Sequence, residues 1–426
     1  MKWRNQLLAL FCLFVFLGLG VLYFQHWVVQ KPFGIILFIG EGLDAARLPM
    51  ARIYAGGANT PLTMDALTNA ALLRNYSLDS AIPDQAAAAT AFATGAKVGN
   101  GALAIDSDGK SLPNLFEVAR ESGRMTGLIT NALVTDPTSA AFFAHTKRSD
   151  QREELARSLA QDAAIDVVLG GGAADFLPIV KGGRRGDDLD LIQEMRGRGY
   201  DVAQSLEELD AIPRWRRAKV FGFFAQTELA FSDEVERGAD QPTLSDMVRR
   251  AIELLQFNSG GYVLVVDAAL MGRAARENKS ERTLAETVEL DRAIAVAQRY
   301  AGTKSMIIVC GDVGIGGLNL NGSPPLGHEK GENEEVLPNE SKITWATGPK
   351  GPHEMPMPVV EENGDDPITP RAAPVNSAFE QPAAVFLPAA QNSAGDVVAF
   401  GVGLGTDPLR GSLDNTAIFE LIRDSF

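Results

Sequence analysis

The chain has 426 residues, of which 46% are hydrophobic and 22% are charged, a composition typical of a globular protein. Its formal net charge of −15 argues against nucleic acid as a partner, because phosphate backbones are bound by basic surfaces. Its two cysteines exclude both a disulfide framework and a cysteine-based zinc site.

The first element in chain order is an apolar run at residues 7–24, which follows the basic residues Lys2 and Arg4. The run is about as long as a helix must be to cross a bilayer. It ends without a small-residue cleavage pattern, and Tyr23 and Trp27 are placed like interfacial aromatics. These features favour an uncleaved signal anchor over a cleaved signal peptide or a buried core helix. We therefore expect a cytoplasmic N-terminus at residues 1–6, a membrane span at 7–24 and a linker at 25–32. The domain at residues 33–426 would lie outside the cytoplasm, on the periplasmic side of the inner membrane if the protein is bacterial.

The remainder alternates between apolar strand-like runs and helical patterns. Runs at residues 33–40, 125–130, 165–172, 261–266 and 305–312 are apolar on both faces, as buried parallel strands are. Helical patterns lie at 61–67, 86–97, 112–120, 151–160, 244–255 and 280–300. The alternation predicts an α/β fold with a mainly parallel central sheet flanked by helices, whose functional side chains gather where strands end. Residues from about 320 to 382 are rich in Pro, Gly, Asn and Glu, and we expect an irregular excursion there, serving as a surface loop or subunit contact.

Several blocks that follow the predicted strands together resemble the alkaline phosphatase family. They are GEGLDAARLPMARIY, IPDQAAAATAFATGAKVGNGALAID, TDPTSAAFFAHT, VVDAALMGRAARENKSERTLAETVELDRAI, IVCGDVGIGG and NSAGDVVAFGVG. The agreement runs from about residue 33 to the C-terminus. The resemblance implies the fold of that family and a centre with two zinc ions, one magnesium ion and a metal-activated serine nucleophile.

The residues at the nucleophile and zinc positions of this family are largely replaced. Gln85 stands at the nucleophile position, and an amide has no hydroxyl to deprotonate. The residues that match lost zinc ligands are Gly272, Arg276, Val313 and Asn392. Two carboxylates, Glu41 and Asp312, are all that remains of the second zinc site. The resemblance therefore identifies a degenerate member of the family, and we predict that zinc is not a cofactor.

Oxygen donors survive where the family binds magnesium. The candidate metal ligands are Glu41, Asp136, Thr138, Asp267 and Asp312. Hard cations such as Mg²⁺ or Ca²⁺ prefer oxygen donors. However, Glu41 stands where the family has an aspartate, and Asp267 stands where it has a glutamate. Each exchange changes the reach of the side chain by about 1.5 Å. The expected cofactor is one such cation, and a site without metal is the alternative.

Three arginines are the basic residues that the resemblance places near this centre. Arg148 lies one residue before the position of the phosphate-binding arginine, so it is either an anion ligand or a solvated surface charge. Arg273 and Arg276 lie where the family has zinc-binding residues. We hypothesise that their guanidinium groups replace the zinc ions and form a salt-bridge network with the clustered carboxylates, Asp84 included. The alternative is that both arginines point to solvent.

These substitutions leave three functional hypotheses. The first is a membrane-anchored, catalytically silent relative, a pseudophosphatase that binds a protein partner or an anionic ligand in the cell envelope. The second is an active metal-dependent phosphatase that hydrolyses phosphate monoesters at a rearranged centre with one hard cation. The third is a structural subunit of a membrane assembly. Family members are commonly homodimers, and no residue in the sequence identifies an interface.

Overall fold

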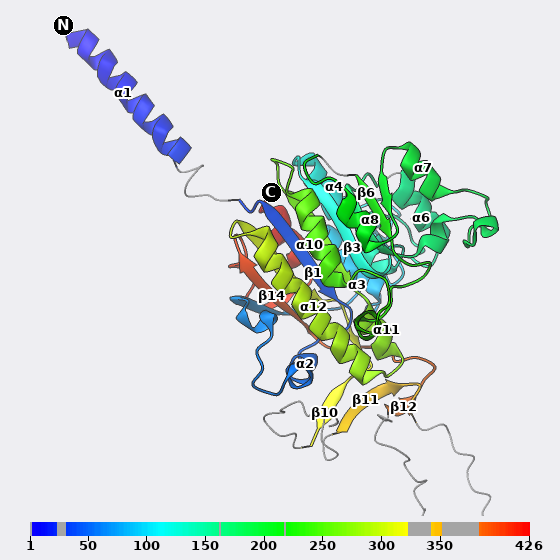
Figure 1. Cartoon of the computed structure of the whole chain (residues 1–426). Helices are drawn as coiled ribbons and strands as arrows, with labels where there is room; N and C mark the ends of the chain where they lie inside the picture. Colours follow the sequence, from blue (N-terminus) through cyan, green and yellow to red (C-terminus); the bar gives the residue numbers. More distant parts are fainter. Residues whose placement is uncertain (1, 24–30, 162, 217–218, 323–341, 352–382) are drawn as a thin grey trace, which may run out of the picture.

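The computed structural model describes residues 2–23, 31–161, 163–216, 219–322, 342–351 and 383–426. Helix α1 (Lys2–Tyr23) stands away from the globular domain (Figure 1). Its segment Trp3–Gly20 is long and apolar enough to cross a membrane, and none of it is buried against the domain. Most of the predicted linker, residues 25–30, lies outside the described part of the chain.

The core of the domain is a ten-stranded sheet with the order β15-β2-β14-β8-β1-β7-β3-β4-β6-β5. Its strands are β1 (Gly34–Gly40), β2 (Asn69–Arg74), β3 (Met125–Leu133), β4 (Val167–Gly171), β5 (Asp201–Ala203), β6 (Val220–Phe223), β7 (Tyr262–Ala268), β8 (Ser305–Gly311), β14 (Val397–Gly403) and β15 (Gly411–Asp414). All run in one direction except β14, which is antiparallel to both of its neighbours. The predicted α/β fold with a mainly parallel sheet is confirmed.

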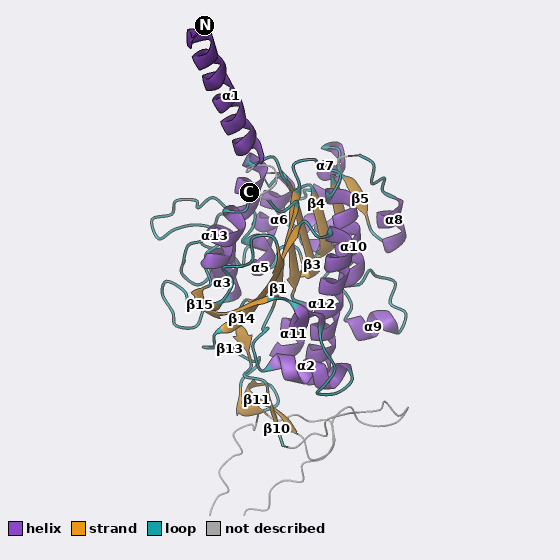
Figure 2. Cartoon of the chain, turned by 90° about the vertical axis from the view of Figure 1, so that its left-hand side faces the viewer, coloured by secondary structure: helices purple, strands orange, loops and turns teal. Residues whose placement is uncertain are grey.

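Two layers of helices cover the sheet because β1 is apolar on both faces. Its residues Ile35, Leu37 and Ile39 join one apolar cluster, and Ile36 and Phe38 join another. The first cluster lies beneath α3 (Gln85–Thr94), α4 (Leu115–Glu121), α5 (Pro137–Ala140), α6 (Arg152–Gln161), α7 (Leu191–Gly197) and α13 (Ala417–Arg423). The second lies beneath α2 (Arg47–Ala55), α8 (Leu206–Ala211), α10 (Leu244–Leu255) and α12 (Ser280–Ala301). Figure 2 shows α13 and α3 on one side of the sheet and α10 and α12 on the other.

Short elements complete the described structure. They are the helices α9 (Ser232–Glu236) and α11 (Leu270–Arg276), the 3-10 turns η2 (Thr63–Ala66), η3 (Ala173–Phe176) and η4 (Ile179–Lys181), and the strands β9 (Gly314–Ile315), β10 (Asn319–Asn321), β11 (Lys342–Gly348), β12 (Ala383–Phe386) and β13 (Asn392–Ser393). Strand β11 lies inside the stretch that we expected to be irregular. It forms because Ile343 and Trp345 alternate with more exposed residues and are buried in a third apolar cluster. Residues 323–341 and 352–382 of that stretch lie outside the described residues.

The parallel strands all begin on one side of the sheet, here called the amino edge, and all end on the opposite side, here called the carboxyl edge. Both names refer to the ends of the strands, not to the outermost strands β15 and β5. Gly34, the first residue of β1, pairs with Tyr262 at the start of β7 and with Ser305 at the start of β8. Val167 in β4 likewise pairs with Val220 at the start of β6. The chain therefore enters the domain from α1 at the amino edge, and the candidate site residues lie at or just beyond the carboxyl edge.

Candidate functional site

Three buried carboxylates meet at the carboxyl edge. Glu41 follows β1, Asp267 lies near the end of β7 and Asp312 follows β8, and these three strands are neighbours in the order β8-β1-β7. The parallel register pairs Ile39 with Asp267, so Glu41 and Asp267 extend from adjacent strand ends. Glu41 is 3% exposed and both aspartates are 0% exposed.

The two aspartates of this group are each hydrogen-bonded through one oxygen only. Asp267 Oδ2 accepts bonds from Ser139 Oγ at 3.0 Å and Thr130 Oγ1 at 3.2 Å, and Asp312 Oδ1 accepts from the backbone N–H groups of Gly42 and Val313. The other oxygens, Asp267 Oδ1 and Asp312 Oδ2, are buried and have no hydrogen-bond partner in the described part of the chain. Burial, then the charge of Asp136, raises the pKa of Asp267 to about 8. Burial also raises the pKa of Asp312 to about 6, against the lowering effect of its two backbone hydrogen bonds.

Glu41 is the third member of the group. Its Oε1 accepts a long hydrogen bond from Thr138 Oγ1 at 3.5 Å. Burial, followed by the charges of Asp267 and Asp312, raises the pKa of Glu41 well above its usual value. Carboxylates this close together do not all remain ionised unless protons, a cation or basic side chains neutralise them.

Basic side chains surround a fourth carboxylate, Asp136, which follows β3 and is 1% exposed. Arg273, on α11, places Nη2 2.5 Å from Asp136 Oδ2. Arg152 at the start of α6 lies 3.4 Å from the other oxygen, Oδ1. Although burial disfavours the charge of Arg273, Asp136 and Glu41 together raise its pKa. Both oxygens of this candidate metal ligand are therefore engaged by guanidinium groups.

A second arginine of α11 joins two positions that match zinc ligands. Arg276 Nη2 donates to Asn392 Oδ1 at 2.9 Å, and Asn392 Nδ2 donates to the carbonyl of Pro83 at 2.9 Å. Arg276 also donates to the carbonyl of Ala390 and accepts a bond from its N–H, which holds the segment before β13 on the end of α11. A continuous chain of hydrogen bonds thus runs from α11 to the loop that precedes α3.

The remaining two positions that match zinc ligands present no donor atom. A Cβ at position 272 would lie 2.4 Å from Glu41 Oε2, so the glutamate occupies the space beside Gly272. Val313 is fully buried in the third apolar cluster, together with Trp345 and Ala275. Val313 is therefore held by apolar packing and offers no ligand atom.

The helix that carries the nucleophile position begins at Gln85, which is half-buried. Asp84 caps this helix: its Oδ1 accepts from Ala87 N at 2.8 Å and its Oδ2 accepts from Gly101 N at 2.6 Å. Burial raises the pKa of Asp84 even though both oxygens accept hydrogen bonds. Asp84 is thus engaged by backbone groups rather than by an arginine in the described part of the chain.

Two other candidate groups lie outside the carboxylate group. The side chain of Arg148 is 62% exposed and pairs with Asp150 at 3.1 Å. His145, the one histidine among the described residues, contacts the carbonyl of Ala104 and Glu117. Among the described residues, these side chains pair with those groups rather than with Glu41, Asp267 or Asp312.

Sequence reasoning missed Arg47, a fully buried arginine of α2. Its Nη1 donates to the carbonyl of Glu41 at 3.1 Å, while Nε and Nη2 have no partner among the described residues. Burial lowers the pKa of Arg47, and Asp44, Asp312 and Glu41 oppose that shift. The only sequence signal was its position six residues after Glu41, which alone does not distinguish a buried cation from a surface one.

The donor set decides which metals fit this arrangement. Zinc does not fit, because its matched positions carry a glycine, an arginine, a valine and an amide that is bonded to that arginine. For a single hard cation, Asp267 and Asp312 each offer one uncommitted oxygen. Asp136, however, is engaged by Arg273 and Arg152, and no three His, Cys, Asp or Glu side chains of the described residues are placed to hold an ion. A magnesium site that includes Asp136, as expected from the sequence, therefore does not fit these contacts.

Comparisons with known proteins agree with this fold. The sequence model of the family described as alkaline phosphatase matches residues 34–425. Alkaline phosphatase H of Pseudomonas aeruginosa is 32% identical over 331 residues, covering 66% of this chain and 69% of that protein. The alkaline phosphatase of Escherichia coli is 29% identical over 327 residues, covering 65% and 69%. The solved structure of the Thermus thermophilus alkaline phosphatase superposes with a TM-score of 0.73 at 23% identity, covering 93% of this chain and 92% of that one.

Proposed function

The chain belongs to the alkaline phosphatase family, and from that membership we propose that it is a catalytically silent member, a pseudophosphatase. In this proposal α1 anchors it in a membrane, with the domain outside the cytoplasm. It acts by binding a protein partner or an anionic ligand in the cell envelope, as a monomer or a homodimer. The basic residues Lys2 and Arg4 before the apolar run favour this orientation.

The observation that carries the proposal is the hydrogen bond between Arg276 and Asn392. In an active relative the residues at these two positions would both face one zinc ion. Here a cationic donor and an amide acceptor satisfy each other, and the amide also donates to Pro83 beside the nucleophile position. Recruiting zinc would require breaking these bonds and would place a metal cation beside a guanidinium cation.

Charge balance supports the same conclusion. The carboxylates Glu41, Asp267 and Asp312 need positive charge nearby if they are to be ionised. Three guanidinium groups lie close enough to lower the free-energy cost of that ionisation. The charge of the buried Arg47 is attracted by Asp312 and Glu41 and so offsets part of the repulsion between these two carboxylates. Arg273 contacts Asp136, and the charge of Arg276 lowers the pKa of Asp312. We propose that these arginines replace the metal ions as the structural cations of the centre, because an ionised group in a buried site is stable only when it is paired.

The proposal is tested on the full-length chain purified in detergent. Hydrolysis of p-nitrophenyl phosphate and its diester is measured with Zn²⁺, Mg²⁺ and Mn²⁺, and the metal content of the same sample is determined. We expect no metal-dependent turnover and no stoichiometric metal. Gln85→Ser should remain inactive, because a restored hydroxyl without zinc ligands is not activated. Metal-dependent turnover that disappears in Asp312→Asn, with the melting temperature unchanged, would overturn the proposal.

The second candidate is an active phosphoesterase that uses one hard cation and hydrolyses phosphate monoesters. The uncommitted oxygens of Asp267 and Asp312 are the observation in its favour. The same experiment separates the two candidates. Bound Mg²⁺ or Ca²⁺ near one ion per chain, together with turnover, supports this second candidate, whereas a metal-free inactive chain supports the first.

A further inference from the structure

The amino edge of the sheet is held close to the anchor by the length of the chain between them. Residues 24–30 separate α1 from the first described residue of the domain, Lys31. Seven residues reach at most about 25 Å even when fully extended. If α1 spans a membrane, Lys31, where the chain enters the domain at the amino edge, therefore lies within that distance of the end of the span, whatever path the linker takes.

Two large aromatic side chains are exposed on this edge. Trp215 is 71% exposed in the loop before β6, and Phe257 is 52% exposed in the turn before β7. Exposing aromatic side chains of this size to water is unfavourable in free energy. Placing them at a membrane surface is favourable, and tryptophan in particular is enriched there.

Basic residues accompany these aromatics in a chain whose net charge is −15. Arg214 and Arg216 flank Trp215, and their side chains are 66% and 41% exposed. Arg214 lies 3.5 Å from Glu253, and Arg216 lies 2.6 Å from Asp201. Ion pairs with this much exposure are weak, so a phosphate group that approaches the edge competes for both guanidinium groups.

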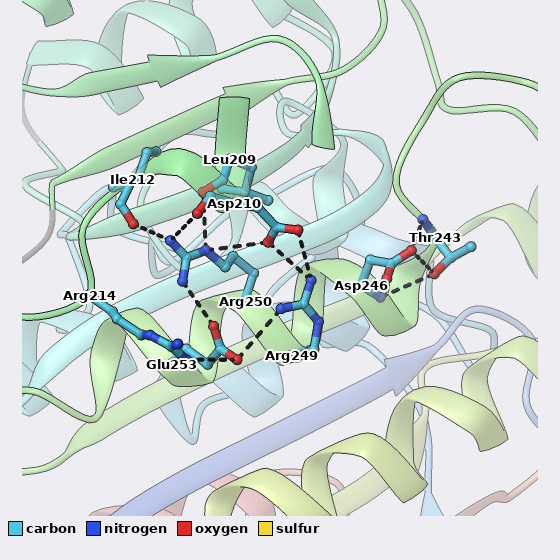
Figure 3. A network of polar contacts seen from close by, with 9 residues as sticks. All are labelled: Leu209, Asp210, Ile212, Arg214, Thr243, Asp246, Arg249, Arg250 and Glu253. Atoms are coloured by element: carbon cyan, nitrogen blue, oxygen red, sulfur yellow. Dashed lines mark hydrogen bonds and ion pairs between the residues drawn. The ribbon is translucent and has the colours of Figure 1, made fainter. Parts of the chain in front are cut away.

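The base of the loop that carries Trp215 is held by hydrogen bonds to Arg250. Figure 3 shows Arg250 at the centre of a polar network at the end of α8. The buried guanidinium of Arg250 donates to the carbonyls of Leu209 and Asp210 in the last turn of α8, to the carbonyl of Ile212 just after the helix, and to Glu253. An arginine that caps a helix end in this way holds the following residues in one path. A hollow of about 490 Å³ lies between this network and Trp215.

We propose that the amino edge rests on the membrane, with Trp215 in the interface and Arg214 and Arg216 against anionic lipid headgroups. This inference rests on the membrane anchor of the proposed function. Its occupant is a lipid surface rather than a protein, because the edge is adjacent to the anchor and carries the aromatic and basic residues that such surfaces bind. One consequence is a fixed orientation in which the carboxylate group at the opposite edge faces away from the bilayer.

The test uses the full chain in lipid nanodiscs, in a background where Trp3 and Trp27 are replaced by Phe. Brominated phosphatidylcholine quenches tryptophans that enter the interface, and the remaining Trp345 is 2% exposed. Discs of phosphatidylcholine alone are compared with discs that contain roughly one-third phosphatidylglycerol. We expect Trp215 quenching to be at least about twofold greater in the anionic discs and to weaken at about 0.5 M salt, where screening is strong.

Matched variants identify the side chains. Arg214→Gln combined with Arg216→Gln should reduce quenching in anionic discs to the level of neutral discs. Arg237→Gln, which removes an equally exposed arginine at the end of α9, should leave it unchanged. If brominated lipid does not quench Trp215 in discs of either composition while the chain stays in the discs, the inference is overturned and the anchor is not affected. This includes the case in which Trp215 is shielded by protein.

Failure of the anchor is recognised separately. A chain that alkaline carbonate releases from the discs lacks a membrane span, which contradicts the anchor of the proposed function. The released chain is then sedimented with anionic vesicles of the same composition. Cosedimentation that Trp215→Ser abolishes still supports a lipid-binding edge, and the absence of cosedimentation overturns it.

Discussion

Replacing Arg273 by methionine tests whether a guanidinium group stands in for a metal ion. Arg273 is 31% exposed and contacts Asp136, which is 1% exposed. Methionine keeps most of the apolar volume of the arginine stem and removes its charge. Among the described residues Asp136 then retains one cationic partner, Arg152 at 3.4 Å, and a hydrogen bond from the backbone N–H of Leu133 at 3.3 Å.

The expected loss of stability follows from this geometry. Removing one partner of a buried charge pair costs about 3–5 kcal/mol. Because Arg273 is partly exposed and Arg152 remains, we expect the lower part of that range or slightly less, about 2–3 kcal/mol. Arg152→Met is the matched control, since it contacts the same carboxylate from a side chain that is 42% exposed. It should cost only about 0–1 kcal/mol, as exposed pairs do.

The assay is chemical unfolding of both variants and the parent, with EDTA or with millimolar Mg²⁺. If Arg273 replaces a cation, the parent gains nothing from Mg²⁺, because the guanidinium already occupies that position. Arg273→Met should instead become Mg²⁺-dependent and gain about 1.4 kcal/mol when the ion is tenfold above its Kd. Arg152→Met should show no such gain.

Two results would refute this reasoning. One is a parent chain that loses stability in EDTA, which would mean that a metal already occupies the centre. The other is equal destabilisation by Arg273→Met and Arg152→Met, which would mean that burial does not distinguish the two contacts.

The remaining predictions concern a close contact and a buried carboxyl group. Gly272→Ala should destabilise the fold by about 1–3 kcal/mol, since its Cβ would lie 2.4 Å from Glu41 Oε2. Gly197→Ala, at the last residue of α7 with open space around it, should be neutral or stabilise the fold by up to about 1 kcal/mol in the same unfolding assay. Burial raises the pKa of Glu286 from 4.5 to about 7, so the folded state holds this proton more tightly and stability should fall as pH rises between those values. The decrease in the free energy of unfolding due to Glu286 is about 3 kcal/mol over this pH interval. It should be absent when Glu286→Gln is unfolded across the same pH range. Parallel pH profiles of stability for the two proteins would contradict this prediction.

The sequence alone was sufficient for the elements whose pattern is local. Strands β1, β3, β7 and β8 are continuous apolar runs, and α10 spans the residues at which its helical pattern begins and ends. Such runs are predictable because burial on both faces of a parallel sheet requires them. Strand β11 was not predicted, because its short alternation lies within a stretch dominated by turn residues.

The positions of the carboxylates Glu41, Asp267 and Asp312 at the carboxyl edge were also readable in the sequence, since each lies at the end of a predicted strand. The prediction that Gln85 stands at the nucleophile position and Arg276 at a zinc-ligand position required only the matched blocks. The sequence did not indicate which of these side chains contact one another. It left open whether Arg273 and Arg276 point to solvent or into the centre.

The tertiary structure decided those contacts. Arg276 meets Asn392 across 116 positions, and Arg273 meets Asp136 across 137, because the register of the sheet and the placement of α11 bring these segments together. Arg47 is the clearest case: nothing in its local sequence separates it from a surface arginine. Only the folded structure, in which α2 packs against α12, buries it near Glu41 and Asp312. The local sequence pattern specifies which residues lie at the end of a strand. The charge balance of a buried centre depends instead on distances between segments that are remote in the chain, and only folding sets those distances.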